Sequence, residues 1–291
     1  MHVVSIRTYV HFFIAGRSRF VRRGTVGMKN TVATFQEMKQ KGEKISMLTC
    51  YDYSTAKLMD EAGVNSLLIG DSLGNVILGY EDTLSVTMED MIHHTAPVAR
   101  GAKNALVIAD MPFMSYQASV YDAVTNAGRL MKEGRANAVK LEGGEEVLES
   151  VGRILSAGIP VMGHLGLTPQ SIHKFGTYVV RAQEDAEAKK LIEDAHLLEE
   201  AGCFAIVLEK IPAKLAAQVA KELTIPIIGI GAGGGVDGQV LVIHDMLGIN
   251  QEFSPRFLRR YHNLYAEITG AVGNYINDVK SGNFPNEREQ Y

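Results

Sequence analysis

Cysteine is scarce in this sequence, which has only Cys50 and Cys203 among 291 residues. Two cysteines at this separation form neither a metal-ligand motif nor a disulfide framework, and such scarcity is typical of a protein from a reducing compartment. We therefore expect both thiols to pack in the core. Long apolar runs are also missing, because none approaches the roughly 18 residues that a membrane helix requires. The sequence thus predicts a soluble protein.

An excess of charge of one sign is missing as well. The chain has 29 basic and 33 acidic residues, spread along its length, and a formal net charge of -4. This distribution lacks the cationic surface of a nucleic-acid-binding protein and favours a small-molecule substrate. Residues 35–285 contain no linker rich in proline or serine, and 46% of all residues are hydrophobic. We therefore predict one folded catalytic domain over residues 28–291.

Acidic residues are absent from positions 1–27, which contain five arginines. A secretory signal is disfavoured, because the apolar stretch at 9–15 is short, contains His11 and is followed by basic residues. We expect a disordered N-terminal extension, with Met28 as the start of the folded protein. An organelle transit peptide is the alternative, because it shares this composition.

Short apolar runs rich in β-branched residues recur along the chain, each followed by a segment with helical periodicity. This alternation predicts parallel strands joined by crossover helices. The eight runs are residues 45–50, 66–70, 105–109, 138–141, 160–163, 204–208, 226–230 and 240–243. The helical segments include residues 53–62, 88–100, 120–133, 145–157, 184–201 and 213–222. Eight such units predict a single α/β domain, a closed (β/α)8 TIM barrel.

A doubly wound open sheet is the alternative fold. It does not require eight strands, and no G-x-G-x-x-G motif follows the first run. The final helical segment, residues 255–281, is longer than closing the barrel requires. It is expected either to pack on a neighbouring subunit or to remain a solvated C-terminal helix.

Polar residues stand where five successive strands end. Asp71 and Ser72 follow the second run, Asp110 the third, and His164 the fifth, while Lys140 and Glu142 end the fourth and Glu209 the sixth. Taken singly, an acidic residue here could cap the next helix, and His164 could be a core histidine. Taken together, they meet at the rim of the barrel where catalytic groups of this fold lie.

Three of these carboxylates form a hard, all-oxygen set. Asp71, Asp110 and Glu142 repel one another when desolvated, so they need a cation or a proton. The set suits Mg²⁺, whereas Zn²⁺ is disfavoured because no cysteine or paired histidine joins it. Lys140 points to the same side as Glu142. It either anchors a substrate carboxylate or balances the charge of Glu142.

Two further features concern the rest of the rim. Glu209 lies on the sixth strand, farther round the barrel from the three carboxylates, and is free to act as a base. A glycine-rich segment at residues 229–235 follows the seventh strand. It could bind phosphate through backbone amides, or form a tight loop that leaves room for a bulky ligand.

The sequence resembles the ketopantoate hydroxymethyltransferase family over roughly residues 30–285. The resemblance rests on several long motifs: Gly70-Asp71-Ser72-Leu73-Gly74, Ala109-Asp110-Met111-Pro112-Phe113, Val139-Lys140-Leu141-Glu142-Gly143-Gly144, Gly163-His164-Leu165-Gly166-Leu167-Thr168-Pro169-Gln170-Ser171, Val207-Leu208-Glu209 and Val242-Ile243-His244-Asp245. Residues 1–27 have no counterpart in the family, and residues 233–236 are richer in glycine than usual.

The resemblance implies an activity. In this family, 5,10-methylenetetrahydrofolate donates a hydroxymethyl group to 3-methyl-2-oxobutanoate, which gives 2-dehydropantoate in pantothenate (coenzyme A) biosynthesis. The chemistry suits a Mg²⁺-stabilised enolate formed by removal of the C3 proton. The resemblance also implies a cytoplasmic homo-oligomer, commonly a homodecamer, whose last helix packs against a neighbour.

Family roles are implied for the matching positions. These are Asp71, Asp110 and Glu142 at Mg²⁺, Asp71, Ser72, Asp110 and Lys140 at the oxoacid, Glu209 as proton acceptor, and His164 in a supporting role that stays open. Two alternative functions would use some of the same residues. One is another Mg²⁺-dependent 2-oxoacid C–C lyase or mutase that needs no folate, and the other is a barrel that binds a ligand without catalysis.

Overall fold

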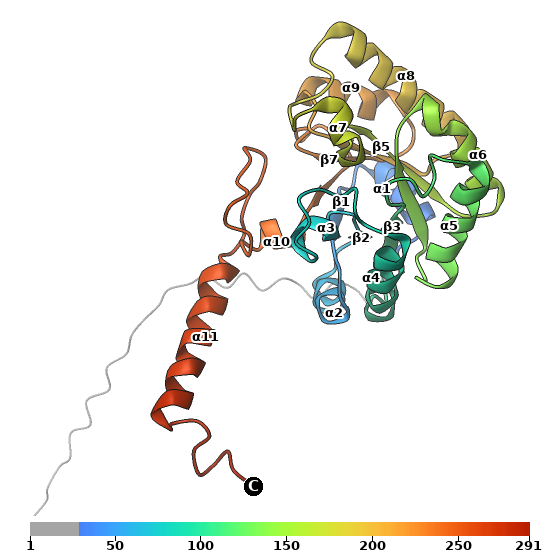
Figure 1. Cartoon of the computed structure of the whole chain (residues 1–291). Helices are drawn as coiled ribbons and strands as arrows, with labels where there is room; N and C mark the ends of the chain where they lie inside the picture. Colours follow the sequence, from blue (N-terminus) through green and yellow to red (C-terminus); the bar gives the residue numbers. More distant parts are fainter. Residues whose placement is uncertain (1–28) are drawn as a thin grey trace, which may run out of the picture.

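Eight parallel strands form a closed barrel in the computed structural model, which describes residues 29–291 (Figure 1). Strands adjacent in sequence are neighbours in the barrel, and β8 pairs with β1. The strands are β1 (Ile45–Thr49), β2 (Ser66–Ile69), β3 (Leu106–Asp110), β4 (Ala138–Glu142), β5 (Val161–Gly166), β6 (Ala205–Glu209), β7 (Ile227–Ile230) and β8 (Gly238–Leu241). The TIM barrel prediction is confirmed, and the alternative of an open sheet is wrong. The extension expected at residues 1–27 lies outside the described residues.

Helices cover the outside of the barrel. The longer ones around it are α2 (Tyr53–Ala62), α4 (Met88–Gly101), α5 (Val120–Lys132), α6 (Leu148–Ser156), α8 (Asp185–Ala201) and α9 (Ala213–Glu222). The bounds of α2 match the prediction because both ends carry local signals: Asp52 accepts a hydrogen bond from the Thr55 backbone N–H at 2.9 Å, and Gly63 takes a left-handed conformation at φ 88°. The segment predicted as one helix over residues 145–157 begins instead as a 3-10 turn, η1 (Glu145–Val147).

Two apolar clusters hold the barrel together. One lies between the strands and the outer helices, and the other fills the barrel interior. Helix α1 (Val32–Lys41), which the sequence did not predict, adds Phe35 to the interior cluster. Phe35 is fully buried and meets Phe204 edge to face, with ring centroids 6.1 Å apart. Val32 and Met38, each three residues from Phe35, pack partly buried against the same cluster.

Strands β3 to β6 extend farther toward the rim than predicted, whereas β1, β2 and β8 end one or two residues before their predicted ends. Asp110, Glu142, His164 and Glu209 all lie within strands rather than after them. Their backbones continue the parallel ladder, with Glu142 opposite His164 and Glu209 opposite Gly166. A polar side chain does not interrupt ladder hydrogen bonds, which use only backbone groups. The predicted boundaries followed the apolar residues and so stopped too early.

The C-terminal segment differs from the prediction of one helix over residues 255–281. The long helix α11 spans Leu264–Ser281 and begins where the Asn263 side chain accepts a hydrogen bond from the Ala266 backbone N–H. The preceding residues form a loop that Arg260 holds through several backbone carbonyls. Figure 1 shows α11 standing away from the barrel, and none of its residues is buried. No helix within residues 29–291 is long and apolar enough to cross a membrane.

Replacing Phe35 with alanine should lower the free energy of unfolding by about 3–5 kcal/mol, because it leaves a cavity at a fully buried aromatic position. Urea unfolding followed by circular dichroism measures the change. Tyr121→Ala is the matched control, since Tyr121 is 79% exposed and its loss should change stability by no more than about 0.5 kcal/mol. Equal effects of the two substitutions would contradict a core role for Phe35.

Candidate active site

Alternation along the strands carries polar side chains into the mouth of the barrel. Ile108 on β3 and Val207 on β6 belong to the interior cluster, and Asp110 and Glu209 follow each of them by two positions. Alternate residues of a strand point to the same side. The polar residues therefore form the layer directly above the apolar filling, at the carboxyl ends of the strands, as predicted.

A lysine among carboxylates occupies the centre of this layer. Lys140 Nζ lies 3.1 Å from Asp110 Oδ1, and both residues are buried. Asp110 Oδ2 accepts a hydrogen bond from the Asp71 backbone N–H at 3.1 Å, which places Asp71 and Ser72 beside the pair. Gly70 makes this approach possible, because a Cβ there would lie 2.8 Å from Ser72 Oγ. The predicted oxoacid-binding residues are thus brought together.

His164 connects this centre to the predicted base. Its Nδ1 lies 3.1 Å from Lys140 Nζ and 3.2 Å from Glu142 Oε1, and its Nε2 lies 3.4 Å from Glu209 Oε2. If the ring is neutral and its Nδ1 accepts a hydrogen bond from Lys140, its proton lies on Nε2. If the ring is protonated and its Nδ1 donates to Glu142, Nε2 also carries a proton. The Nε2–H therefore faces Glu209 in either state. This contact is long and poorly aligned, so it is electrostatic rather than a well-formed hydrogen bond.

Gln170 is a central residue of the site that the sequence reasoning did not single out. Its backbone N–H donates to Glu142 Oε2 at 3.0 Å, and its side-chain Nε2 donates to Asp71 Oδ2 at 2.8 Å. The Tyr116 hydroxyl donates to Gln170 Oε1 at 2.8 Å and accepts from the Glu142 backbone N–H at 3.0 Å. Gln170 lies in the 3-10 helix η2 (Pro169–Ser171) after β5, where no strand periodicity marks it. Its place in a family motif was the only available signal.

The cluster carries more negative than positive charge. Burial, with Asp110 and Glu142 nearby, raises the pKa of Asp71 well above its usual range. Burial also raises the pKa of Asp110, although Lys140 opposes the shift. Burial alone would lower the pKa of Lys140, but the three carboxylates outweigh it and raise that pKa. One lysine does not fully offset three buried carboxylates, so the cluster favours a further cation.

The fit to Mg²⁺ rests on the chemistry of these donors. Within residues 29–291, no three histidine, cysteine or acidic side chains are arranged so that they could hold a metal together. Glu142 is engaged at both oxygens, by His164 and by the Gln170 N–H. Asp110 Oδ1 is buried beside Lys140 Nζ at 3.1 Å, but among the described residues it accepts no well-formed hydrogen bond. Mg²⁺ needs only one or two protein carboxylates and takes its other ligands from water and substrate, so Asp71 and Asp110 fit it.

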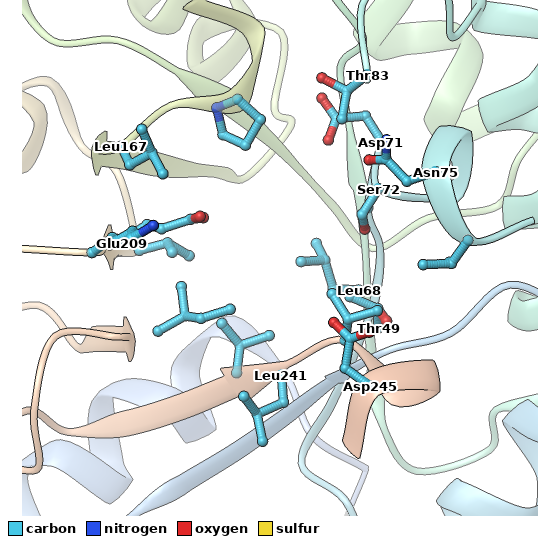
Figure 2. A pocket seen from close by; sticks show the side chains of 18 of the residues that line it. Thr49, Leu68, Asp71, Ser72, Asn75, Thr83, Leu167, Glu209, Leu241 and Asp245 are labelled. Carbon is cyan, nitrogen blue, oxygen red and sulfur yellow. The ribbon is translucent and has the colours of Figure 1, made fainter. Parts of the chain in front are cut away.

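The cluster opens into a cavity of about 380 Å³ at the mouth of the barrel. Figure 2 shows Glu209 on one side of it, facing Asp71 and Ser72 across the open space. Thr49 and Asp245 lie on a further side, away from Glu209. The side chain of Glu209 is 20% exposed, whereas those of Asp110, Lys140, Glu142 and His164 are about 5% exposed or less. Glu209 is therefore the acid of this group that a substrate reaches most easily.

The glycine-rich segment serves the packing of the loop. A Cβ at Gly233 would lie 2.4 Å from Ala213 Cβ, and one at Gly235 would lie 2.6 Å from Ala217 Cβ. Both contacts are with α9, so these glycines let the loop approach the helix closely. Of the segment at residues 229–235, only Ile230 lines the cavity. One of the two predictions for this segment was a tight loop, and the loop is tight. The geometry gives no support to the other prediction, phosphate binding.

The two thiols take no part in the site. Cys50 and Cys203 are buried, as expected, and burial raises the pKa of each to about 12. A thiol with so high a pKa is a poor nucleophile at neutral pH. Neither cysteine lines the cavity, whose ionisable side chains include carboxylates, a lysine and a histidine.

Comparisons with known proteins agree with the geometry. A family model described as ketopantoate hydroxymethyltransferase matches residues 29–287. A protein from Parabacteroides distasonis is 67% identical over 90% of this chain and 96% of its own length. One from Porphyromonas gingivalis is 65% identical with the same coverage. Both are named 3-methyl-2-oxobutanoate hydroxymethyltransferase.

Solved structures show the same fold at low sequence identity. A phosphoenolpyruvate phosphomutase from Streptomyces platensis superposes with a TM-score of 0.60 at 13% identity, over 87% of this chain and 88% of that one. A phosphonopyruvate hydrolase gives a TM-score of 0.59 at 12% identity, over 89% and 93%. At these identities the likeness concerns the barrel alone.

Replacing Lys140 with methionine should lower the free energy of unfolding by about 3–5 kcal/mol at neutral pH, because it leaves buried carboxylates without their cation. The pKa of Asp110 then rises further. Such a carboxyl has a pKa in the folded protein that is higher than its unfolded value of about 3.9. Its contribution to stability is present below a pH of about 3.9 and is lost as the pH rises through the folded pKa. The deficit of the variant should therefore shrink as the pH falls toward about 4.

Urea unfolding in EDTA, repeated across this pH range, measures the deficit. Lys214→Met, at an exposed position on α9, is the control and should behave like the wild type. A deficit of Lys140→Met that is the same at every pH would mean that lost packing, not lost charge, causes it.

Proposed function

The chain belongs to the ketopantoate hydroxymethyltransferase family and transfers a hydroxymethyl group to 3-methyl-2-oxobutanoate in pantothenate biosynthesis; we propose that its donor is 5,10-methylenetetrahydrofolate, its metal Mg²⁺ and its product 2-dehydropantoate. The family favours this reaction over the lyase or mutase and over the non-catalytic barrel. Product analysis tests the proposal: 2-dehydropantoate should form only when the oxoacid, the folate and Mg²⁺ are all present. Formation without folate would contradict the proposed donor.

The oxoacid binds at the buried cluster. Asp71 and Asp110, with Glu142 as the third predicted residue, hold Mg²⁺, and Lys140 attracts the carboxylate of the oxoacid. Ser72 is placed to donate a hydrogen bond to the same substrate, since its hydroxyl lines the cavity next to Asp71. When bound, Mg²⁺ supplies positive charge that polarises the 2-oxo group and makes the C3 proton more acidic.

Glu209 is the proton acceptor. The observation that carries this assignment is its position, partly exposed and across the cavity from Asp71 and Ser72 (Figure 2). Glu209 removes the C3 proton, and the carbon left with the electron pair attacks the one-carbon unit carried by folate. Water then adds to that unit as its bond to the folate nitrogen breaks, so the hydroxymethyl group stays on C3 and tetrahydrofolate leaves with the proton. His164 Nε2 lies 3.4 Å from Glu209 Oε2 and stabilises the charge of that carboxylate electrostatically. This gives His164 the supporting role that the family resemblance left open.

We further propose a homo-oligomer in which α11 packs on a neighbouring subunit. Apolar side chains recur on α11 with the three- and four-residue spacing of a coiled-coil seam. They are Tyr265, Ile268, Val272, Tyr275 and Val279, and all are more than 40% exposed in the single chain. An exposed apolar stripe of this kind is typical of a subunit contact. The family's homodecamer is the assembly we propose.

The proposed location is the cytoplasm, which the family resemblance implied. The alternative is an organelle, with residues 1–27 as a transit peptide. This segment lies outside the described part of the chain, so the composition of its sequence is the only basis for that alternative.

Replacing Asp110 with asparagine should weaken the binding of Mg²⁺ and of the oxoacid together, because both depend on this carboxylate. Removing a residue that only supports a metal ligand typically lowers metal affinity by roughly 10–100-fold. Asp110 is itself a proposed ligand, so we expect at least this loss. Calorimetric titration measures both ligands. Asp185→Asn, at an exposed position at the start of α8, is the control. Oxoacid affinity that is unchanged both in Asp110→Asn and after EDTA treatment would exclude binding through the metal.

Replacing Glu209 with glutamine should remove the base but keep the shape of the site. The informative assay is deuterium exchange at C3 of 3-methyl-2-oxobutanoate in D2O with Mg²⁺ and no folate. The exchange rate should fall by about 10²–10⁴-fold, the usual contribution of a general base. Glu81→Gln is the control, because Glu81 lines the same cavity. Exchange at the wild-type rate in Glu209→Gln would transfer the role of base to another group, with His164 the next candidate.

Replacing Ile268 with glutamate should reduce the assembled mass, because it puts a charge in the middle of the apolar stripe of α11. Sedimentation velocity measures the mass distribution. Asn274→Glu adds the same charge to the same helix outside the stripe and should leave the assembly intact. An unchanged assembly in Ile268→Glu would show that α11 does not form the contact.

A further inference from the structure

The cavity extends beyond the part that the oxoacid occupies. Its volume of about 380 Å³ lies in the range of sites for drug-sized ligands, roughly 300–1,000 Å³, whereas the oxoacid has a five-carbon skeleton. One further wall of the cavity comes from the end of β8, from α10 (Ile243–Met246) and from the loop that follows it. None of the residues assigned to the metal, the oxoacid or the proton lies on this wall.

Asp245 on α10 is the one acidic residue of this wall among the described residues that line the cavity. It is only 6% exposed, and its Oδ1 accepts a hydrogen bond from Asn250 Nδ2 at 3.2 Å. Its Oδ2 accepts no hydrogen bond from residues 29–291 and is not among the fully buried atoms that lack a partner, so this oxygen is accessible. Figure 2 shows the side chain on the side of Thr49 and Leu241.

The loop beside Asp245 is held in shape by the chain itself. Arg260 Nη2 donates to the backbone carbonyls of Asn250 at 3.3 Å and Phe253 at 3.0 Å. Phe253 and Phe257 meet edge to face, with ring centroids 6.5 Å apart, and both line the cavity. Gly231 gives Phe257 its place, because a Cβ at Gly231 would lie 3.0 Å from that ring. The wall therefore combines a carboxylate with two aromatic rings set at a steep angle to each other.

We propose that this wall binds the pterin ring of the folate co-substrate, with Asp245 accepting hydrogen bonds from its N3–H and 2-amino groups and with Phe253 and Phe257 beside the ring. The assignment rests on the proposed folate donor. The pyrimidine half of a pterin presents two adjacent N–H donors, and a carboxylate presents two acceptor oxygens in a matching geometry. Oδ1 keeps a free lone pair beside the bond from Asn250, so both oxygens can accept.

The test uses the full chain with Mg²⁺, 3-methyl-2-oxobutanoate and tetrahydrofolate, which carries no one-carbon unit and so binds without turnover. Calorimetry should show that Asp245→Asn raises the dissociation constant of tetrahydrofolate by about 10–100-fold, the usual value of hydrogen bonds to a charged group. Glu252→Gln is the matched control, because Glu252 lies in the same loop, is exposed and does not line the cavity. Oxoacid binding, measured in parallel, reports whether each variant has folded.

A second ligand tests the assignment even if the Asp245→Asn substitution alters the protein away from the cavity. A tetrahydrofolate analogue with methyl in place of the 2-amino group should bind the wild type about tenfold more weakly than tetrahydrofolate, while Asp245→Asn should hardly distinguish the two ligands. Equal affinity of wild type and Asp245→Asn for tetrahydrofolate would overturn the role of Asp245 alone. Absence of tetrahydrofolate binding in the wild type would instead overturn the proposed donor.

Discussion

The burial of carboxylates around Lys140 is the constraint on which the rest of the site depends. Asp71, Asp110 and Glu142 lie in a layer where water cannot solvate their charge, so the cluster is stable only with compensating donors and cations. Lys140 supplies one positive charge and Gln170 supplies two N–H donors, one to Asp71 and one to Glu142. The negative charge that remains favours a further cation at this end of the barrel, which the proposed Mg²⁺ would supply.

Closure of the barrel explains how these groups meet. They lie on or next to β2, β3, β4 and β5, with Lys140 and Glu142 both on β4, and parallel strands bring their carboxyl ends to the same rim. The apolar interior, with Val207 and Ile108 directly below the polar layer, excludes water from beneath it. The same interior fixes the strand positions, so the side chains of Asp110 and Glu209 are held by the core as well as by their own contacts.

The C-terminal part of the chain forms two structures, one over the rim of the barrel and one that stands away from it. The segment from α10 to Asn263 folds back over the rim and completes the cavity through Asp245, Asn250 and Phe257. Helix α11 turns away from the barrel and exposes its apolar stripe. Asn263 separates the two by capping the helix.

The sequence by itself determined the eight strands and the polar residues at their ends. Strand periodicity is local, so the apolar run before Asp110 or Glu209 shows both the strand and the rim to which it points. Only the tertiary structure decided that Gln170 joins Asp71 to Glu142, that residues 255–263 form a loop and that Asp245 lines the cavity. These contacts join segments far apart in the chain, and they exist only after the barrel has closed and its loops have packed across the rim.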